Sequence, residues 1–482
     1  MLRREEHSRE VLDMPVAELI DSSLFEVAEH LRRRELSPVE LTEAALARIE
    51  RVDPVLHAFI IVMAAEARAA ARAAEQEIGA GRYRGPLHGV PIGVKDLCET
   101  AGVRTTAGSS FLSRWVPDRD ATVVRKLRDA GAVIIGKLNL HEFAFGATGI
   151  NPHTGTARNP WDLDRLTGGS SSGSGAAVAA GTCFAALGSD TGGSIRMPAS
   201  LCGIVGIKPT HGRVSLRGVV PLAPSLDTVG PMARDVRDAA LVLQAIAGHD
   251  PDDPWSVDVP VADYTAHLDA GVAGIRVGVP SAYAFDDCEA EVAAAVERAV
   301  VLLGSLGVRR VEVDGGALGV WWIAAMNVVL GEAAEVHRQR YEANAADFGE
   351  DVRGILTAAL ELPASQYVAA ARLRDALRRG EAEERLFAAA DVVMMPATRV
   401  VAPRVADIAP GDPLGSLTHN TAPFNLAGLP ALSIPCGVTS AGLPIGLQMV
   451  GRHWDEGTLV RVAAAYEAAR GAMPAPSVLY PR

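Results

Sequence analysis

Short apolar runs that end at Gly or Pro, separated by Ala-rich helical stretches, constrain the fold of this chain more than any other feature. Runs of four to six residues are typical of buried strands, and their alternation with helices is typical of α/β proteins. We therefore expect an α/β fold with a large mixed central β-sheet covered by helices on both faces. The runs occupy residues 90–94, 132–135, 184–187, 275–279, 392–395, 431–434 and 445–450.

The segment before the first of these runs has a different sequence pattern. Residues 16–82 read as helical, with Ser37 followed by Pro38 at a helix start and an Ala/Glu/Arg stretch over 63–80. We predict an N-terminal helical arm over residues 1–65 and a single catalytic domain over 66–482. Within that domain, the less regular interval at about 250–390 is expected to be a variable insert that shapes the substrate pocket.

Composition limits the class of function. The 482 residues are 49% hydrophobic and carry a formal charge of −12, which describes a folded protein with no global attraction for nucleic acid or an anionic membrane. We therefore expect a small, weakly charged substrate, no nucleic acid partner and no membrane span. The five Cys lack any CxxC pair, so we expect a reducing cytoplasm and neither metal nor cofactor. A homodimer is compatible with the sequence.

Lysine is scarce: only Lys95, Lys126, Lys137 and Lys208 occur among the 46 basic side chains. Codon bias accounts for most of this skew. The surviving lysines still merit attention, because a buried Lys can lose its proton and act as a base whereas Arg cannot. Of the four, Lys95 stands at the end of a buried-looking strand, where a solvated charge is the ordinary alternative.

Two Gly/Ser loops lie between residues 167 and 200, and each precedes an expected helix, at 176–180 and from 195 onward. Outward-facing N–H groups in such loops hold anions or oxyanions. A nucleotide phosphate is disfavoured for two reasons. After Gly193, Ser194 replaces the Lys of a P-loop. The other segment with P-loop spacing, residues 131–137, reads as an apolar strand and not as a loop. The pattern GxSxG at 169–173 would need a downstream acid and His, and no His has a recognisable setting. The remaining candidate for the chemistry of these loops is a serine nucleophile activated by a lysine base.

The combined motifs carry a family resemblance. From about residue 37 to 470 the sequence resembles the amidase signature family of Ser-cisSer-Lys hydrolases. The matching segments are GVPIGVKD (89–96), GKLNLHEFAFG (136–146), NPWD (159–162), GGSSSGSGAAVAAG (168–181), GSDTGGSIRMPASLCGIVGIKPTHGRVS (188–215) and NLAGLPALSIP (425–435).

This resemblance implies roles for individual residues. Ser194 would be the nucleophile, Ser170 the bridging serine after a cis peptide, and Lys95 the base. Neutral Lys95 would accept a proton from Ser170, which takes one from Ser194, and the return path would protonate the leaving amine. Backbone N–H groups would form the oxyanion hole, at Thr191, Gly192, Gly193 and Ser194. Supporting positions would be Gly169, Ser171, Asp190 and Arg196.

The substrate is less constrained. By position, we expect a pocket lined by Ala144, Phe145, Thr148, Trp321, Trp322 and Thr418. Such a pocket favours apolar or aryl amides, with carbamates (as in a urethanase) and esters also plausible substrates. The alternative is the glutamine-hydrolysing subunit of a tRNA amidotransferase, which works in a complex. Because Thr418 stands where such subunits carry an Asp, we expect a stand-alone hydrolase that forms an acyl-enzyme.

Overall fold

A mixed sheet of eleven strands forms the centre of the molecule. The structure, a computed structural model, describes residues 19–409 and 415–476. The order of strands across the sheet is β1-β3-β2-β6-β8-β7-β12-β13-β11-β9-β10. Their bounds are β1 Phe59–Val62, β2 Pro91–Lys95, β3 Val133–Leu138, β6 Ala185–Ser189, β7 Val205–Lys208, β8 Val229–Ala233, β9 Arg276–Pro280, β10 Arg309–Val313, β11 Val392–Pro396, β12 Ala431–Val438 and β13 Pro444–Val450.

Strand direction divides this sheet into three parts. Strands β3, β2 and β6 run parallel to one another. The pairs from β6 through β8, β7, β12 and β13 to β11 are antiparallel, and β11, β9 and β10 are again parallel. All seven apolar runs lie in these strands, and the prediction of a mixed α/β sheet is confirmed. Strand β10, with the sequence RRVEV, is mostly exposed and therefore lacks the apolar signal.

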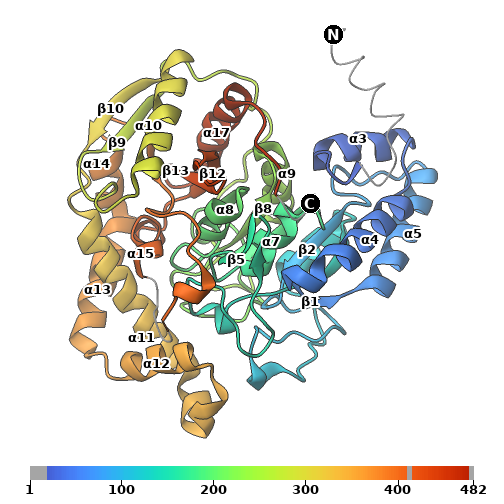
Figure 1. Cartoon of the computed structure of the whole chain (residues 1–482), viewed down its shortest axis with the longest axis horizontal. Helices are drawn as coiled ribbons and strands as arrows, with labels where there is room; N and C mark the ends of the chain where they lie inside the picture. Colours follow the sequence, from blue (N-terminus) through green and yellow to red (C-terminus); the bar gives the residue numbers. More distant parts are fainter. Residues whose placement is uncertain (1–18, 410–414, 477–482) are drawn as a thin grey trace.

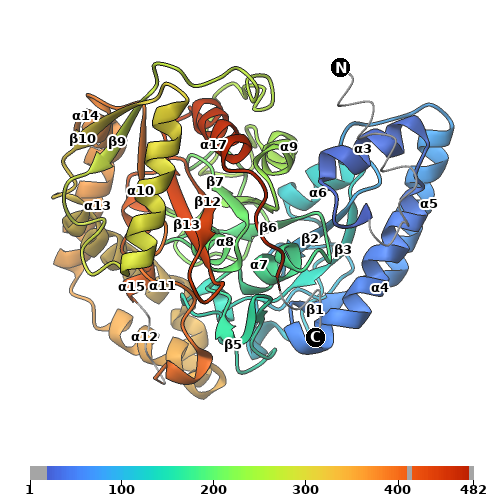
Figure 2. The ribbon, with the colours of Figure 1, turned by 45° about the horizontal axis from the view of Figure 1, so that its top comes forward.

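Helices pack on the two faces of the sheet (Figures 1 and 2). One face carries α7 (Ser172–Ala179) and α8 (Arg196–Cys202), which contact each other and the central strands. The other carries α9 (Val236–Ile246), α10 (Ala290–Ser305) and α17 (Glu456–Arg470). Both α7 and α8 begin directly after the Gly/Ser loops, so the sheet and these short helices fix the two loops side by side.

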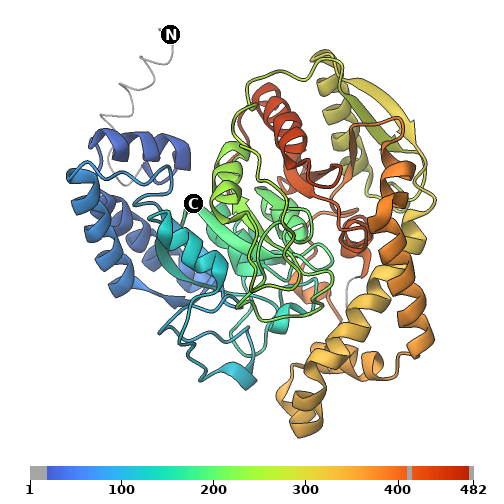
Figure 3. The same cartoon turned by 180° about the vertical axis from the view of Figure 1, so that it is seen from behind.

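The N-terminal helices lie at one end of the molecule (Figures 1 and 3). They are α3 (Leu24–Arg33), α4 (Pro38–Leu56) and α5 (Ala64–Gly79). Ser37 caps α4 by accepting hydrogen bonds from the N–H groups of Val39 and Glu40, as its sequence setting predicts. Strand β1 follows α4 and pairs with β3 at the edge of the sheet. The division into an arm over 1–65 and a domain over 66–482 stays a prediction.

A second helical group lies at the opposite end (Figure 1). It consists of α11 (Leu318–Asn344), α12 (Glu350–Leu360) and α13 (Ala364–Ala376), all within the interval expected to be an insert. Helix α11 packs against both α12 and α13. Among the described residues, no helix has the length and apolar character needed to cross a bilayer.

Candidate active site

Lys95 lies fully buried at the end of β2, surrounded by serine hydroxyls. Its Nζ is 2.7 Å from Ser170 Oγ, 2.9 Å from Ser171 Oγ and 2.8 Å from Ser189 Oγ. Burial lowers the pKa of Lys95 to about 7. A lysine in this setting can be neutral near neutral pH, as a base requires.

The neighbouring hydroxyls define how a neutral Lys95 is oriented. Ser171 Oγ donates a hydrogen bond to the Ser189 carbonyl oxygen at 3.1 Å, so this hydroxyl is left to accept from Lys95. A neutral amine has two N–H donors and one lone pair. With the donors directed at Ser171 and Ser189, the lone pair faces the hydroxyl of Ser170.

Ser170 and Ser194 come from the two Gly/Ser loops. The peptide bond between Gly169 and Ser170 is cis, and the Ser170 carbonyl oxygen accepts a hydrogen bond from the His141 N–H at 3.0 Å. Ser194 follows β6 and lies two residues before the start of α8. Its carbonyl oxygen accepts from the Ser171 N–H at 3.2 Å, which ties the two loops together, and its side chain borders a cavity.

Asp190 organises the turn that carries Ser194. Its carboxylate forms a buried ion pair with Arg196, with Oδ1 2.9 Å from Nη2, and accepts from the N–H groups of Gly193 and Ile195. Although burial opposes ionisation of Asp190, the Arg196 guanidinium lowers its pKa to about 2. The turn is therefore held by a charged group whose hydrogen-bonding capacity is filled, which suits it to fix backbone geometry.

The backbone of this turn offers fewer free donors than the resemblance implies. The Gly193 N–H donates to Asp190 Oδ1 at 2.8 Å, so the expectation that it belongs to the oxyanion hole is corrected. Within the part of the chain that the structure describes, the N–H groups of Thr191, Gly192 and Ser194 have no hydrogen-bond acceptor. Gly193 has a φ of +132°, and a Cβ there would lie 2.2 Å from Thr421 Oγ1, so only glycine fits.

Several buried polar residues that support the turn were missed by the sequence reasoning. Asn425 donates to Asp190 Oδ1 at 2.8 Å and accepts from Arg196 at 2.6 Å. Gln448 accepts from Arg196 at 2.7 Å, and Asp227 accepts from the Thr191 hydroxyl at 2.5 Å. Asn425 lies in the motif NLAGLP, which marks this segment as part of the family signature but does not predict that Asn425 contacts Asp190 and Arg196. Gln448 and Asp227 had no signal in the sequence.

A cavity of about 470 Å³ opens beside Ser194 and is lined mainly by apolar side chains. Ala144, Phe145, Trp322 and Thr418 border it as expected. Two expected positions lie elsewhere. Trp321 is buried in the hydrophobic core, and Thr148 is buried with its Oγ1 3.3 Å from His141 Nδ1. Further residues of the lining are Gly146, Ala147, Thr191, Gly192, Met197, Leu222, Met326, Val329, Leu330, Gly354, Ile355 and Ala358.

Trp322 is held in place at the edge of this cavity. Its Nε1 donates to Thr418 Oγ1 at 2.9 Å, and its ring packs edge-on against His419 with a centroid distance of 4.4 Å. Thr418 therefore orients an indole of the pocket wall. Among the residues of the lining that the structure describes, none has an ionisable side chain.

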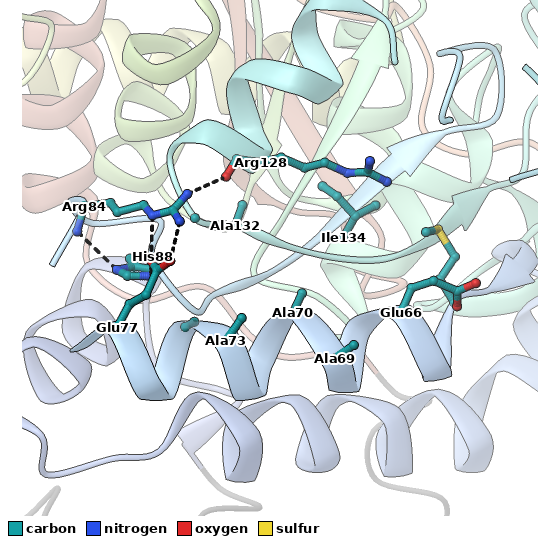
Figure 4. Close-up of a pocket in the computed structure, with 13 residues that line it drawn as sticks. Glu66, Ala69, Ala70, Ala73, Glu77, Arg84, His88, Arg128, Ala132 and Ile134 are labelled. Atoms are coloured by element: carbon teal, nitrogen blue, oxygen red, sulfur yellow. Dashed lines mark hydrogen bonds and ion pairs between the residues drawn. The ribbon is translucent and has the colours of Figure 1, made fainter. Parts of the chain in front are cut away.

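A second cavity lies far from the catalytic groups, between α5 and β3 (Figure 4). Alanines of α5 line its floor, and an ion pair of Glu77 with Arg84, 2.6 Å apart, closes one end near His88. Among the described residues that border this groove there is no hydroxyl or thiol nucleophile, so it is not a candidate for the reaction.

The three remaining lysines each donate a hydrogen bond to a backbone carbonyl oxygen. Lys137 Nζ donates to the Cys98 carbonyl oxygen at 2.5 Å and lies 3.4 Å from Asp96 Oδ1. Lys126 donates to the Ala247 carbonyl oxygen at 2.7 Å, beyond the end of α9. Burial also lowers the pKa of Lys208 to about 7, but among the described residues its Nζ donates to the Pro209 carbonyl oxygen and to no serine hydroxyl.

Comparisons with known proteins agree on the family. A family profile described as Amidase matches residues 40–460. The A subunit of the glutamyl-tRNA(Gln) amidotransferase of Geobacter metallireducens is 43% identical over 94% of this chain and 98% of its own length. The solved structure of the corresponding Thermotoga maritima protein matches with a TM-score of 0.79 and 35% identity, over 97% of this chain and 99% of its own. The peptide amidase of Stenotrophomonas maltophilia matches with a TM-score of 0.83 and 34% identity, over 95% and 99% of the two chains.

These relatives correct one prediction. The expectation of a stand-alone hydrolase of apolar amides rested on Thr418 and its sequence neighbours and on the apolar residues expected to line the pocket. It is contradicted by identities of 43–44% to amidotransferase subunits over nearly the whole of both chains. The relatives also give no support to urethane cleavage. With its fold, its signature motifs and its full-length relatives, the chain belongs to the amidase signature family of enzymes that act on amide C–N bonds.

Proposed function

We propose that this chain is the amide-hydrolysing subunit of an amidotransferase that uses glutamine as its nitrogen donor. The observation that carries the proposal is the 43–44% identity to the A subunits of glutamyl-tRNA(Gln) amidotransferases, which spans 94–96% of this chain and 98–99% of those proteins. In this role the chain releases ammonia from the side-chain amide of glutamine, and partner subunits transfer that ammonia to glutamyl-tRNA. The chain itself, with a charge of −12, need not bind the tRNA.

The proposed reaction begins with attack by Ser194 on the amide carbonyl. As the Ser194 oxygen bonds to carbon, its proton passes to Ser170 Oγ, whose own proton passes to the lone pair of Lys95. The free N–H groups of Thr191, Gly192 and Ser194 are suited to stabilise the oxyanion that forms. Each donor of this type typically contributes about 3 kcal/mol to the transition state.

Collapse of the tetrahedral intermediate returns the proton. Lys95 gives its proton back through Ser170 to the departing nitrogen, which leaves as ammonia, and an acyl-enzyme remains on Ser194. Water then attacks the ester along the same path, and glutamate leaves. Protonation of the nitrogen is essential because an amide anion is too basic to depart.

The cavity lining predicts how free glutamine binds. The methylenes of glutamine can pack against apolar side chains such as Phe145 and Met326. Since no described residue with an ionisable side chain lines the cavity, the described lining offers the α-ammonium and α-carboxylate groups no ion pair. We therefore expect a high KM for glutamine in the isolated chain and a lower KM when partner subunits are bound.

The test is ammonia release from glutamine by the chain alone and by the chain co-expressed with the other amidotransferase subunits of the same genome. We expect Ser194-dependent release that increases in the complex, with Ser194→Ala as the control. The proposal fails if neither preparation hydrolyses glutamine while the same samples hydrolyse simple carboxamides in a Ser194-dependent way.

A further inference from the structure

The cavity beside Ser194 has two walls that come from distant parts of the chain. One is the core wall, formed by the pocket turn at residues 144–147 and the nucleophile turn at 190–194. The other is the helical wall, formed by α11 and α12 (Figure 1). Outside the cavity, His141 packs against the core wall at Gly146, and its Nε2 lies 3.0 Å from Asp351 Oδ2 on α12.

His141 is enclosed against the core wall. Its side chain is 2% exposed, and its backbone N–H donates to the carbonyl oxygen of Ser170. A Cβ built on Gly146 would lie 2.2 Å from the imidazole Nε2, so the ring packs directly against the pocket turn. The hydroxyl of Thr148, the residue directly after that turn, lies 3.3 Å from Nδ1.

Asp351 connects the imidazole to the part of α12 that borders the cavity. It lies in the first turn of the helix, three and four residues before Gly354 and Ile355. Side chains at these spacings share a face of a helix, so fixing Asp351 also fixes the approach of those two lining residues. Although burial opposes ionisation of Asp351, its close contact with the His141 imidazole lowers its pKa.

We propose that His141 and Asp351 are positioning residues that set the distance between the two walls and thereby the size of the acyl group the enzyme accepts. The proposal rests on acylation of Ser194 in this cavity. It does not require that glutamine be the natural donor. Neither residue touches the reacting atoms, so their loss should alter selectivity and KM while the chemistry at Ser194 continues.

Other contacts keep the helical wall attached when this bridge is removed. Glu142 accepts from the Gly349 N–H at 2.8 Å, and Ser110 donates to the Asp347 carbonyl oxygen at 2.9 Å. The rings of Phe111 and Phe348 also pack with their centroids 4.6 Å apart. We therefore expect variants at Asp351 to fold, with a local change in the position of α12.

The first experiment compares acyl selectivity in Asp351→Ala, Asp351→Asn and His141→Ala, with Glu350→Ala as the matched control. Glu350 is the exposed neighbour of Asp351 in the same helical turn. The probes are 4-nitrophenyl acetate, butyrate and hexanoate, whose good leaving group makes acylation easy to follow. We expect the ratio of kcat/KM for hexanoate to that for acetate to change at least 5-fold in Asp351→Ala and His141→Ala. The change should be smaller in Asp351→Asn and absent in Glu350→Ala.

The second experiment needs no turnover, which separates this proposal from the proposed function. Amide hydrogen exchange over residues 345–360 should be at least 10-fold faster in Asp351→Ala than in the unmodified chain and unchanged in Glu350→Ala. The double variant His141→Ala, Asp351→Ala should resemble either single variant in both measurements. Unchanged selectivity together with unchanged exchange in Asp351→Ala would overturn the proposal, whether or not the chain hydrolyses glutamine. If the esters give no signal, the exchange result decides alone.

Discussion

The core wall and the helical wall of the cavity are built on different physical principles. The core wall consists of backbone held by hydrogen bonds and a buried ion pair: Asp190 alone accepts from Gly193, Asn425 and Arg196. The helical wall presents apolar side chains such as Met326 and Ile355. One wall is fixed in geometry by polar contacts of defined direction, whereas the other is fixed in volume by packing.

This difference indicates where chemistry and specificity reside. Hydrogen-bond donors must be placed to within a few tenths of an ångström to stabilise a developing charge, so the core wall tolerates little change. Apolar packing depends mainly on volume and accepts many combinations of side chains. Substitutions in the core wall should therefore reduce turnover, and substitutions in the helical wall should change which substrate is preferred.

The largest effect should come from the nucleophile. Ser194→Ala removes the group that forms the acyl-enzyme, and we expect amide hydrolysis to fall by about 10⁴-fold or more. The measurement is single-turnover hydrolysis with the folded variant, checked by its circular dichroism spectrum. Substantial residual acylation would show that another group on the core wall attacks the carbonyl.

Removal of the base should rank second. Lys95→Ala leaves Ser170 without a proton acceptor, and the loss of a general base typically costs about 10²–10⁴-fold in rate. Lys126→Ala serves as the matched control, because this lysine binds carbonyl oxygens beyond α9, away from the cavity. An active Lys95→Ala enzyme, or an equal loss in Lys126→Ala, would contradict the relay.

A substitution that loosens the core wall should have an intermediate effect. Asn425→Ala leaves buried polar atoms of Asp190 and Arg196 without one partner each, which typically costs about 1–3 kcal/mol. We expect kcat to fall by about 10–100-fold and KM to change little, as measured by steady-state kinetics. Asn344→Ala, at the exposed end of α11, is the control that should have no effect.

The smallest effect should come from the helical wall. Trp322→Ala removes a large ring from the cavity edge, and we expect kcat/KM to change by about 10-fold, since one pocket contact typically contributes about 1–3 kcal/mol. Most of that change should appear in KM. Val320→Ala, on the exposed side of the same helix, should change kcat/KM by less than about 2-fold. If the loss in Trp322→Ala were confined to kcat, it would contradict the distinction between a core wall that governs turnover and a helical wall that governs substrate preference.

The same distinction explains what could be predicted from the sequence. The strands of the sheet were predictable because burial on both sides demands continuous apolar runs, as in β2 and β6. The serines and the lysine proposed for the relay were recognisable because the core wall requires particular residues at particular spacings. The pairing order of the strands was not predictable, since the residues that pair β7 with β12 are far apart in the chain.

The residues of the helical wall were much harder to predict from the sequence. Trp321 and Trp322 are adjacent and chemically identical, yet only Trp322 borders the cavity, because successive side chains on a helix point about 100° apart. Thr418 was read as evidence about the substrate, whereas its hydroxyl holds the indole of Trp322. Inference from one position of a pocket is weak when packing partners are unknown.

The most direct test of the relay is the pH dependence of kcat/KM for amide hydrolysis, which reports ionisation in the free enzyme. Burial lowers the pKa of Lys95 to about 7, and the base is active only when deprotonated. We predict that kcat/KM rises about tenfold per pH unit below pH 7 and reaches a plateau above it, with the same break in His141→Gln. A profile that is flat from pH 5 to pH 9, or Lys95→Arg with normal activity, would contradict the account.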